Sequence, residues 1–184
     1  MPVFKLLTSN VAKLREFQRL ASHLDIVIEK GADLKEVKSD AITTAFHKSK
    51  DASSFTIIED TILEIDGMEV VDIRYRLNEL GTDNPSVALW KTTLAVNDGH
   101  AIKLYIGEVK GVFKQVDISP EDSFGFDAYS VPRDQEKTLY ELHSLNLKDN
   151  FSARALAVNA FCNSEHSHST TINELSTWTG EYQS

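Results

Sequence analysis

The sequence has few of the features that mark extracellular, metal-clustered or membrane-spanning proteins. It contains one cysteine, Cys162, which excludes an internal disulfide and an all-cysteine metal site and suits a reducing cytosol. No apolar run approaches the length of a membrane span, and the opening stretch, MPVFKLLTSN, lacks the architecture of a signal peptide. We therefore expect a cytoplasmic protein with no membrane partner.

Positive charge is also scarce. The chain has 19 lysines and arginines against 28 aspartates and glutamates, which gives a net charge of −9. This balance is unfavourable for binding a nucleic-acid backbone, so we expect no nucleic-acid partner. A few well-placed lysines can still create a local positive site for a phosphorylated small molecule.

The length and composition are those of a soluble globular protein. At 184 residues, with 41% hydrophobic and 26% charged residues, the chain is long enough for one substantial core. We expect a single domain over residues 1–184. The polar stretch 165–184 is an extension to which the sequence assigns no structure.

The hydrophobic pattern predicts the α/β class with a mixed sheet. Strand patterns cover 3–8, 25–30 and 55–66, and 91–113 is typical of a hairpin that turns at Asn97-Asp98-Gly99. Helical patterns cover 11–24, 39–52, 70–80, 85–90 and 151–162. Ser39 is the expected N-cap of the second helix.

The expected helices have defined inward faces. The first presents Leu14, Phe17, Leu20, Ala21 and Leu24, and the second presents Ile42, Ala45 and Phe46.

A polar cluster, Thr8-Ser9-Asn10 with Lys13, lies at the junction of the first strand and the first helix. Free backbone N–H groups and the helix dipole favour an anion there, so these residues suit a phosphate group. A plain helix N-cap explains the same residues. No Walker-type glycine loop is present, so this is not a P-loop site.

Three acidic residues, Glu36, Glu59 and Asp60, form a second candidate cluster. We expect the adjacent pair at the end of the third strand, where carboxylates can bind a hard cation such as Mg²⁺. Successive strand residues point to opposite faces, so Asp60 is the expected metal ligand and Glu59 a supporting charge. The alternative is solvated turn chemistry, although the isoleucines before the pair favour burial, which requires a partner.

Two later stretches carry polar groups suited to a base. In SFGFDAYSVP (123–132), Phe124 can stack on a nucleobase and Asp127 can accept from a base N–H. In KDNFSARAL (148–156), Lys148, Ser152 and Arg154 lie at and just before a helix N-terminus. The alternatives are a core aromatic pair in the first stretch and a serine N-cap with solvated cations in the second.

The order of these motifs resembles the inosine triphosphate pyrophosphatase family, which acts on noncanonical purine nucleoside triphosphates. The similarity runs from about residue 3 to about residue 160. Its carriers are TSNVAKLREF, DLKEV, IIEDTILEIDGM, FGFDAYSVP, KTLYEL and KDNFSARAL. Thr8, Asn10, Lys13 and Glu16 match the opening family pattern, Thr-x-Asn-x-x-Lys-x-x-Glu.

The resemblance implies an elongated mixed sheet, a nucleotide cleft between two lobes, a homodimer and a Mg²⁺ requirement. The implied reaction is hydrolysis of a nucleoside triphosphate, such as ITP, dITP or XTP, to the monophosphate and pyrophosphate. By position, the metal ligands would be Glu36 and Asp60 with Glu59 beside them, and Asp60 would also be the general base. The implied substrate-binding residues are Thr8, Ser9, Asn10, Lys13, Lys48, Thr61, Arg74, Phe124, Gly125, Phe126, Asp127, Lys148, Ser152 and Arg154.

The sequence departs from the family pattern at three places, two of them in the base-binding stretches. Ser152-Ala153-Arg154 replaces Ser-His-Arg, Phe126-Asp127-Ala128 replaces aromatic-Asp-Pro, and EVVDIRYRL (69–77) shortens a Pro-Gly segment, with Arg74 in place of a family cation. One lost base hydrogen bond costs about 0.5 to 3 kcal/mol, which blunts discrimination without abolishing catalysis. Altered base specificity and a catalytically weak nucleotide-binding protein therefore remain alternatives.

Overall fold

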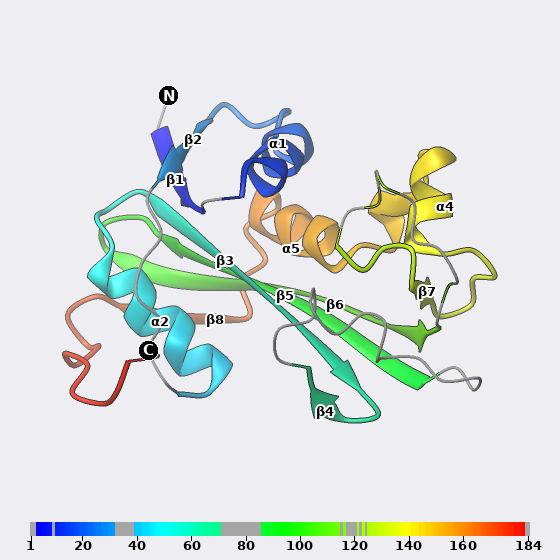
Figure 1. Cartoon of the computed structure of the whole chain (residues 1–184). Helices are drawn as coiled ribbons and strands as arrows, with labels where there is room; N and C mark the ends of the chain where they lie inside the picture. Colours follow the sequence, from blue (N-terminus) through cyan, green and yellow to red (C-terminus); the bar gives the residue numbers. More distant parts are fainter. Residues whose placement is uncertain are drawn as a thin grey trace. The chain divides into compact units, whose positions relative to one another are not determined.

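The computed structural model is a mixed eight-stranded sheet with helices (Figure 1), and it describes residues 3–8, 10–31, 39–70, 86–114, 116, 121, 123 and 125–182. The strand order is β2-β1-β3-β5-β6-β7, with β4 paired to β3 and β8 paired to β6. β1 pairs in parallel with β2 and β3, whereas β6 pairs antiparallel with β7 and β8. The predicted α/β class with a mixed sheet is confirmed.

The first third of the chain alternates strands and helices, as the sequence predicts. The elements are β1 (Val3–Leu7), α1 (Val11–Leu20), β2 (Val27–Gly31), α2 (Ala41–Asp51) and β3 (Thr56–Ile65). On α1, Phe17 is fully buried and Leu14 and Leu20 pack against the same cluster, which confirms the predicted inward face, although the helix ends at Leu20 and not at Leu24 as predicted. On α2, Ala45 is buried, with Ile42 and Phe46 packed beside it.

The remaining strands are β4 (Met68–Glu69), β5 (Ser86–Asn97), β6 (Ala101–Phe113), β7 (Ser130–Pro132) and β8 (His168–Thr171). The predicted hairpin turn is confirmed, because β5 ends at Asn97 and β6 begins at Ala101. The helix predicted over 85–90 is wrong, since Ser86–Trp90 belongs to β5. Ala88 and Trp90 are buried there with a more exposed residue between them, which is the period of a strand.

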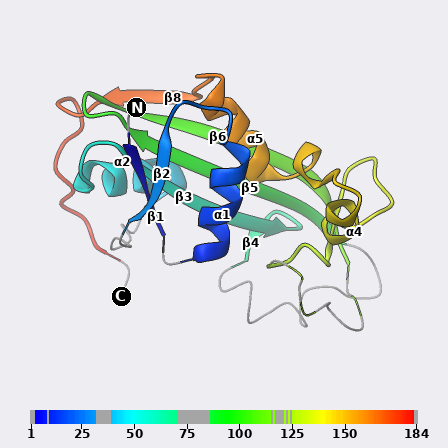
Figure 2. The ribbon, with the colours of Figure 1, turned by 90° about the horizontal axis from the view of Figure 1, so that it is seen from above.

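The helices of the second half are α4 (Leu139–Ser144), the 3₁₀ turn η1 (Lys148–Asn150) and α5 (Ala153–Cys162). The prediction of a final helix over 151–162 is confirmed apart from its first two residues. The polar extension contains β8, which runs beside β6 (Figure 2). The helix predicted over 70–80 lies outside the described residues after Val70.

The extent of the third strand, predicted over 55–66, is confirmed, but the place of the acidic pair within it is not. β3 continues to Ile65 with Leu63 and Ile65 buried, so Glu59 and Asp60 lie in the middle of the strand. The expectation that the strand ends at this pair is therefore wrong. The apolar residues beyond the pair keep the alternation of a strand, and they bury their side chains in a different cluster from those before it.

The chain divides into two compact units, and β3, β5 and β6 each contribute residues to both. Unit 1 comprises 1–60, 93–106 and 157–184, and unit 2 comprises 61–92 and 107–156. In unit 1, consecutive residues of β3 enter different clusters: Ile57 packs with Phe17 of α1, and Ile58 packs with Ala45 of α2. The two helices therefore cover opposite faces of β3.

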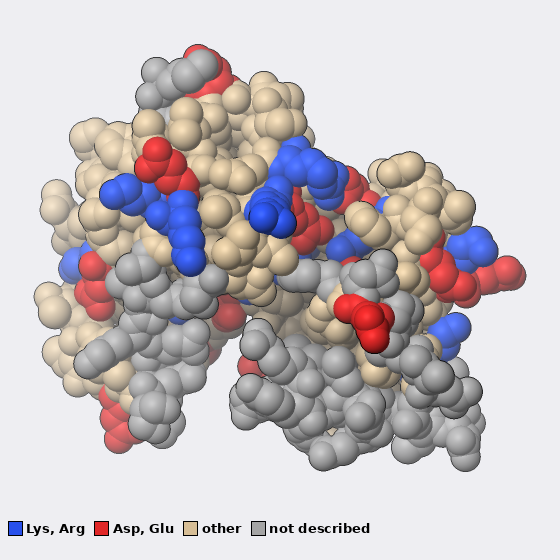
Figure 3. Space-filling view, turned by 45° about the horizontal axis from the view of Figure 1, so that its top comes forward, with Lys and Arg blue, Asp and Glu red and all other residues tan. Residues whose placement is uncertain are grey.

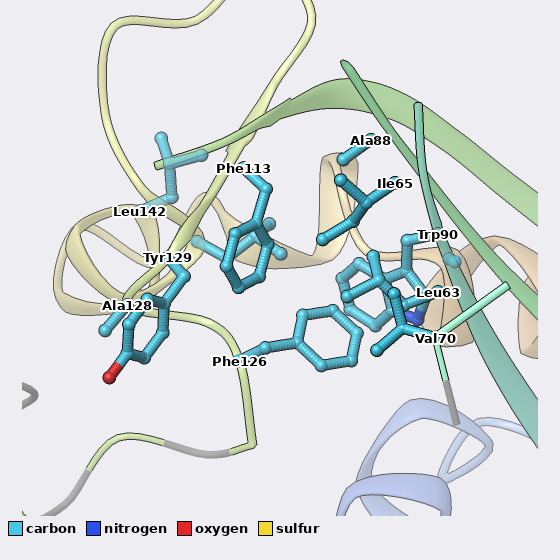
Figure 4. Close-up of a cluster of buried hydrophobic side chains, with 12 residues drawn as sticks. Leu63, Ile65, Val70, Ala88, Trp90, Phe113, Phe126, Ala128, Tyr129 and Leu142 are labelled. Atoms are coloured by element: carbon cyan, nitrogen blue, oxygen red, sulfur yellow. The ribbon is translucent and has the colours of Figure 1, made fainter. Parts of the chain in front are cut away.

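The core of unit 2 is rich in aromatic residues (Figure 4). Phe126 meets Trp90 edge to face, with ring centroids 5.1 Å apart, and Phe113 stacks on Tyr129 at 5.4 Å. Such pairs stabilise a core beyond the area that they bury. Phe126 is thus a core residue, as the alternative reading of its motif expects.

No helix within the described ranges is long and apolar enough to cross a membrane.

The N-cap of α2 is one residue later than predicted. The Asp40 carboxylate accepts hydrogen bonds from the backbone N–H groups of Ile42 and Thr43, whereas the Ser39 hydroxyl donates to Asp40. Both residue types cap helices well, so sequence preference alone does not separate adjacent candidates. Ser39 as the N-cap is therefore wrong.

We predict that Asp40→Ala lowers the free energy of unfolding by about 1 kcal/mol because the cap is lost. Hydrogen bonds from the side chain and backbone of Thr43, together with the Ile42 N–H, hold the pKa of Asp40 below its ordinary value. A lowered folded-state pKa gives stability that is present at neutral pH and lost as the pH falls through that pKa. Urea denaturation should therefore show the difference between the two proteins shrinking below about pH 4. Ser39→Ala, the control, should have little effect, and an equal loss in both variants would contradict the assignment.

Candidate active site

The junction between β1 and α1 is held by its own polar side chains. The Asn10 side-chain oxygen caps α1, accepting from the backbone N–H groups of Ala12 at 3.0 Å and Lys13 at 3.3 Å. The buried Thr8 hydroxyl accepts from the Asn10 N–H at 3.1 Å. The N-cap reading is thus confirmed, and phosphate binding by this loop stays a prediction. Ser9 lies outside the described residues.

The adjacent carboxylates of β3 have different surroundings. The Glu59 side chain is 1% exposed, and its Oε1 lies 3.3 Å from the Lys13 Nζ. Asp60 is exposed, and the alternation along β3 places it on the face of Ile58 and α2. The sequence predicted this separation of the pair but not the lysine partner of Glu59.

Lys48, the second predicted triphosphate lysine, lies partly buried in the last turn of α2. Thr61 follows Asp60 on β3, and its hydroxyl lies 3.1 Å from the hydroxyl of Thr92 on β5. Three further predicted residues lie outside the described residues, namely Glu36, Arg74 and Phe124.

In unit 2 the predicted base-reading residues converge on a buried ion pair. The Lys148 Nζ lies 2.6 Å from the Asp127 Oδ2, and both side chains are 6% exposed. Ser152 is fully buried and its hydroxyl accepts from the Ala155 N–H at 3.3 Å, which confirms it as the cap of α5. Arg154 is buried in the first turn of α5, so the alternative of solvated cations here is wrong.

The bend before Asp127 depends on glycine. Gly125 has φ +58°, in the left-handed region, and nothing lies within 4 Å of the place where a Cβ would be. Glycine adopts this conformation without strain, which lets the chain turn from the surface into the core at Phe126. The bend thus orients the segment that carries Asp127.

The residues present fit a hard cation in donor type. Within the described ranges, no three histidine, cysteine, aspartate or glutamate side chains gather as a metal group. Mg²⁺ in nucleotide enzymes is typically held by one or two carboxylates together with waters and substrate phosphates. The exposed carboxylate of Asp60 meets that requirement, and Glu36 is the second predicted ligand.

Charge on the surface is mixed. In Figure 3, lysine and arginine side chains alternate with aspartate and glutamate side chains over the described part of the face that it draws. The described part of this face therefore has small groups of basic side chains and no broad basic surface. Such groups can bind a small anion.

Cys162 lies at the end of α5 and is partly buried. Burial raises the pKa of its thiol above the ordinary value. The thiolate, which is the nucleophilic form, is correspondingly scarce at neutral pH. This agrees with a reaction that needs no covalent nucleophile.

Comparisons with known proteins agree with the motifs. No protein-family model matches the chain. It is 26% identical over 176 residues to a dITP/XTP pyrophosphatase from Saccharolobus solfataricus, covering 84% of this chain and 89% of the relative. Its fold matches a HAM1 protein from Coxiella burnetii (TM-score 0.67, 20% identity, 90% of this chain and 98% of that one). It also matches the Staphylococcus aureus Ham1 protein (TM-score 0.62, 20% identity, 89% and 97%).

These similarities agree with the resemblance of the chain to the inosine triphosphate pyrophosphatase family, from whose pattern it diverges. Two of the three departures from the family pattern fall on buried positions of unit 2, and the third, around Arg74, lies outside the described residues. Ala153, where the family has histidine, is 0% exposed, and Ala128, where the family has proline, is 3% exposed. Both pack in the aromatic cluster around Phe126. The two alanines therefore contribute to the core of unit 2.

Sequence reasoning missed the partners of the predicted site residues. Thr92 bonds Thr61 from β5, a strand whose first residues were predicted as helix. Burial alternates only in the first half of β5, which explains why that part is a strand but does not identify the contact between Thr92 and Thr61. The pairing of Lys13 with Glu59 joins residues far apart in the chain, and no local pattern identifies it.

We predict that Lys148→Met lowers the free energy of unfolding by about 3 to 5 kcal/mol because it removes the cation that lies 2.6 Å from the buried Asp127 carboxylate. Asp127→Asn in the same protein should restore most of the loss. The control is Lys91→Met, which removes the half-exposed pair with Glu108 at 3.9 Å and should cost about 0 to 1 kcal/mol. Denaturant unfolding measures all three variants, and equal losses in the two lysine variants would refute the buried-pair account.

Proposed function

We propose that the protein is a nucleoside triphosphate pyrophosphatase that hydrolyses non-standard purine nucleotides, such as ITP, dITP and XTP, to the monophosphate and pyrophosphate. The observation that carries the proposal is the similarity to a dITP/XTP pyrophosphatase over most of both chains. It is supported by an exposed carboxylate, Asp60, on the strand whose neighbouring carboxylate pairs with the helix-terminal Lys13. These are the groups that hydrolysis of a polyphosphate requires.

In the proposed reaction, a water oxygen attacks the α-phosphorus. The new phosphorus–oxygen bond forms as the bond to the oxygen bridging the α- and β-phosphates breaks, and pyrophosphate leaves. Asp60 orients the water and accepts its proton, the role of a general base. Chemistry of this kind depends on positioning and electrostatics, so no covalent intermediate is needed.

The triphosphate is proposed to bind residues of unit 1. Lys13 and Lys48 would balance the negative charge that develops on the phosphate oxygens, with Thr8 and Asn10 shaping the loop at the α1 N-terminus. When bound, Mg²⁺ would neutralise further phosphate charge, and Asp60 with Glu36 would hold it.

The base is proposed to bind residues of unit 2. Asp127 accepts from the base N–H, and Lys148, Ser152 and Arg154 add polar contacts beside it. The Lys148 ammonium group, 2.6 Å from the Asp127 carboxylate, offsets the cost of burying that carboxylate. A homodimer, a single domain and a cytoplasmic location complete the proposal and rest on the resemblance and the composition.

A second candidate function is nucleotide binding with altered base preference and weak catalysis. The observation that favours it is the fully buried Ala153 in place of the family histidine. With that side chain absent, a hydrogen bond to the base is lost and discrimination falls. The catalytic residues Lys13 and Asp60 are nevertheless retained, and they favour the enzyme.

We predict pyrophosphate release when the protein is incubated with Mg²⁺ and ITP or XTP. A panel that also contains dUTP, GTP and ATP measures base preference, and we expect it to be blunted. Asp60→Asn should lower kcat by about 10²–10⁴-fold, the usual contribution of a general base. Glu64→Gln, four residues further along β3, is the matched control and should keep its activity. Tight nucleotide binding with no pyrophosphate from any member would establish the binding protein instead.

A further inference from the structure

The carboxylate of Glu59 is buried in unit 1 and forms an ion pair with Lys13 of α1, a contact that the family motif does not specify. The alternation of β3 places it on the face of Ile57, which packs with Phe17 of α1. Its side chain is 1% exposed, and its Oε1 is 3.3 Å from the Lys13 Nζ. A carboxylate withdrawn from water needs a cation or hydrogen-bond donors, and Lys13 supplies one.

Lys13 in turn occupies an unfavourable place on its helix. With Asn10 as the N-cap, Lys13 is in the first turn of α1, at the positive end of the helix dipole. That turn contains no acidic side chain to offset the lysine charge. The carboxylate of Glu59 on β3 offsets the lysine charge instead. The ammonium group of Lys13 can therefore lie at the positive end of the helix dipole at a lower electrostatic cost.

The exposure of the two partners differs in a way that matters for binding. Glu59 is enclosed, whereas the Lys13 side chain is 25% exposed and reaches solvent. An ammonium group has three N–H donors, so a contact with Glu59 leaves donors for a second anion. The ammonium group of Lys13 therefore contacts Glu59 on its buried side and can bind an anion on its solvent-exposed side.

We infer that Glu59 is a positioning residue that holds the Lys13 ammonium at the α1 N-terminus, ready for a polyphosphate. A lysine side chain has four rotatable bonds, and fixing it beforehand removes an entropic cost from ligand binding. Glu59 is thereby distinct from Asp60, which points to the other face of β3. This inference rests on the proposed function only in naming the polyphosphate as part of a nucleotide.

The kinetic test compares Glu59→Gln with Lys13→Met and the double variant. Glu59→Gln keeps the shape but removes the charge, and we expect kcat/KM for the nucleotide to fall about 10- to 100-fold. The Mg²⁺ concentration for half-maximal activity should not change, because Glu59 is not a metal ligand. The double variant should match Lys13→Met within about twofold, because the two residues act as one unit.

Three kinetic outcomes would overturn the inference. The first is an unchanged kcat/KM for Glu59→Gln, and the second is a raised Mg²⁺ requirement for that variant. The third is a loss of kcat/KM in the double variant that equals the product of the losses in the two single variants. Glu59→Asp keeps the charge and should recover part of the activity. If thermal melting shows that the Glu59→Gln protein is unfolded, Glu59→Asp is used in its place.

A binding test separates this inference from the proposed function. Inorganic tripolyphosphate, titrated calorimetrically without Mg²⁺, should bind the wild-type protein, bind Glu59→Gln about tenfold more weakly and bind Lys13→Met weakest. This order in a protein that releases no pyrophosphate from nucleotides would refute the proposed function and support the role of Glu59. Equal binding by wild type and Glu59→Gln, or no binding by wild type, would overturn the role of Glu59 even in an active enzyme.

Discussion

A buried carboxylate must be neutralised by a nearby cation, and each of the two units contains one carboxylate that meets this constraint with a lysine. In unit 1 the pair is Glu59 with Lys13, and in unit 2 it is Asp127 with Lys148. Such pairs add little net stability, but removing one partner is strongly destabilising because it leaves an uncompensated buried charge. Each pair ties a helix or helical turn to the strand or bend that it faces.

The alternating first third of the chain was predictable because its signals are local. The faces of α1 and α2 follow from apolar spacing, and the turn after Asn97 follows from its Asn-Asp-Gly sequence. The stretch Ser86–Trp90 was wrongly predicted as helix, because five apolar-rich residues fit either period and only pairing within the sheet decides between them. The acidic pair was wrongly placed at the end of β3 for a related reason: two charged residues resemble a strand end when their partners are unknown.

The candidate site was predictable in its members but not in its connections. The motifs named Lys13, Asp60, Asp127 and Lys148, and the order of those motifs along the chain carried the family resemblance. Contacts between distant segments, such as the pairing of Glu59 with Lys13, could not be predicted from the sequence because side-chain pairing depends on tertiary packing. The effect of Ala153 is of the same kind, since only the packing shows that this position is enclosed.

β8 changes which backbone groups the sheet offers to other chains. β6 is rich in apolar residues, and a strand of that kind with unpaired backbone groups is a template for aggregation. β8 pairs with its first residues, from Ala101 to Leu104, using the polar sequence His168–Thr171. The outward edge at that end is therefore short, exposed and rich in hydroxyl groups, a composition unfavourable for pairing with another chain.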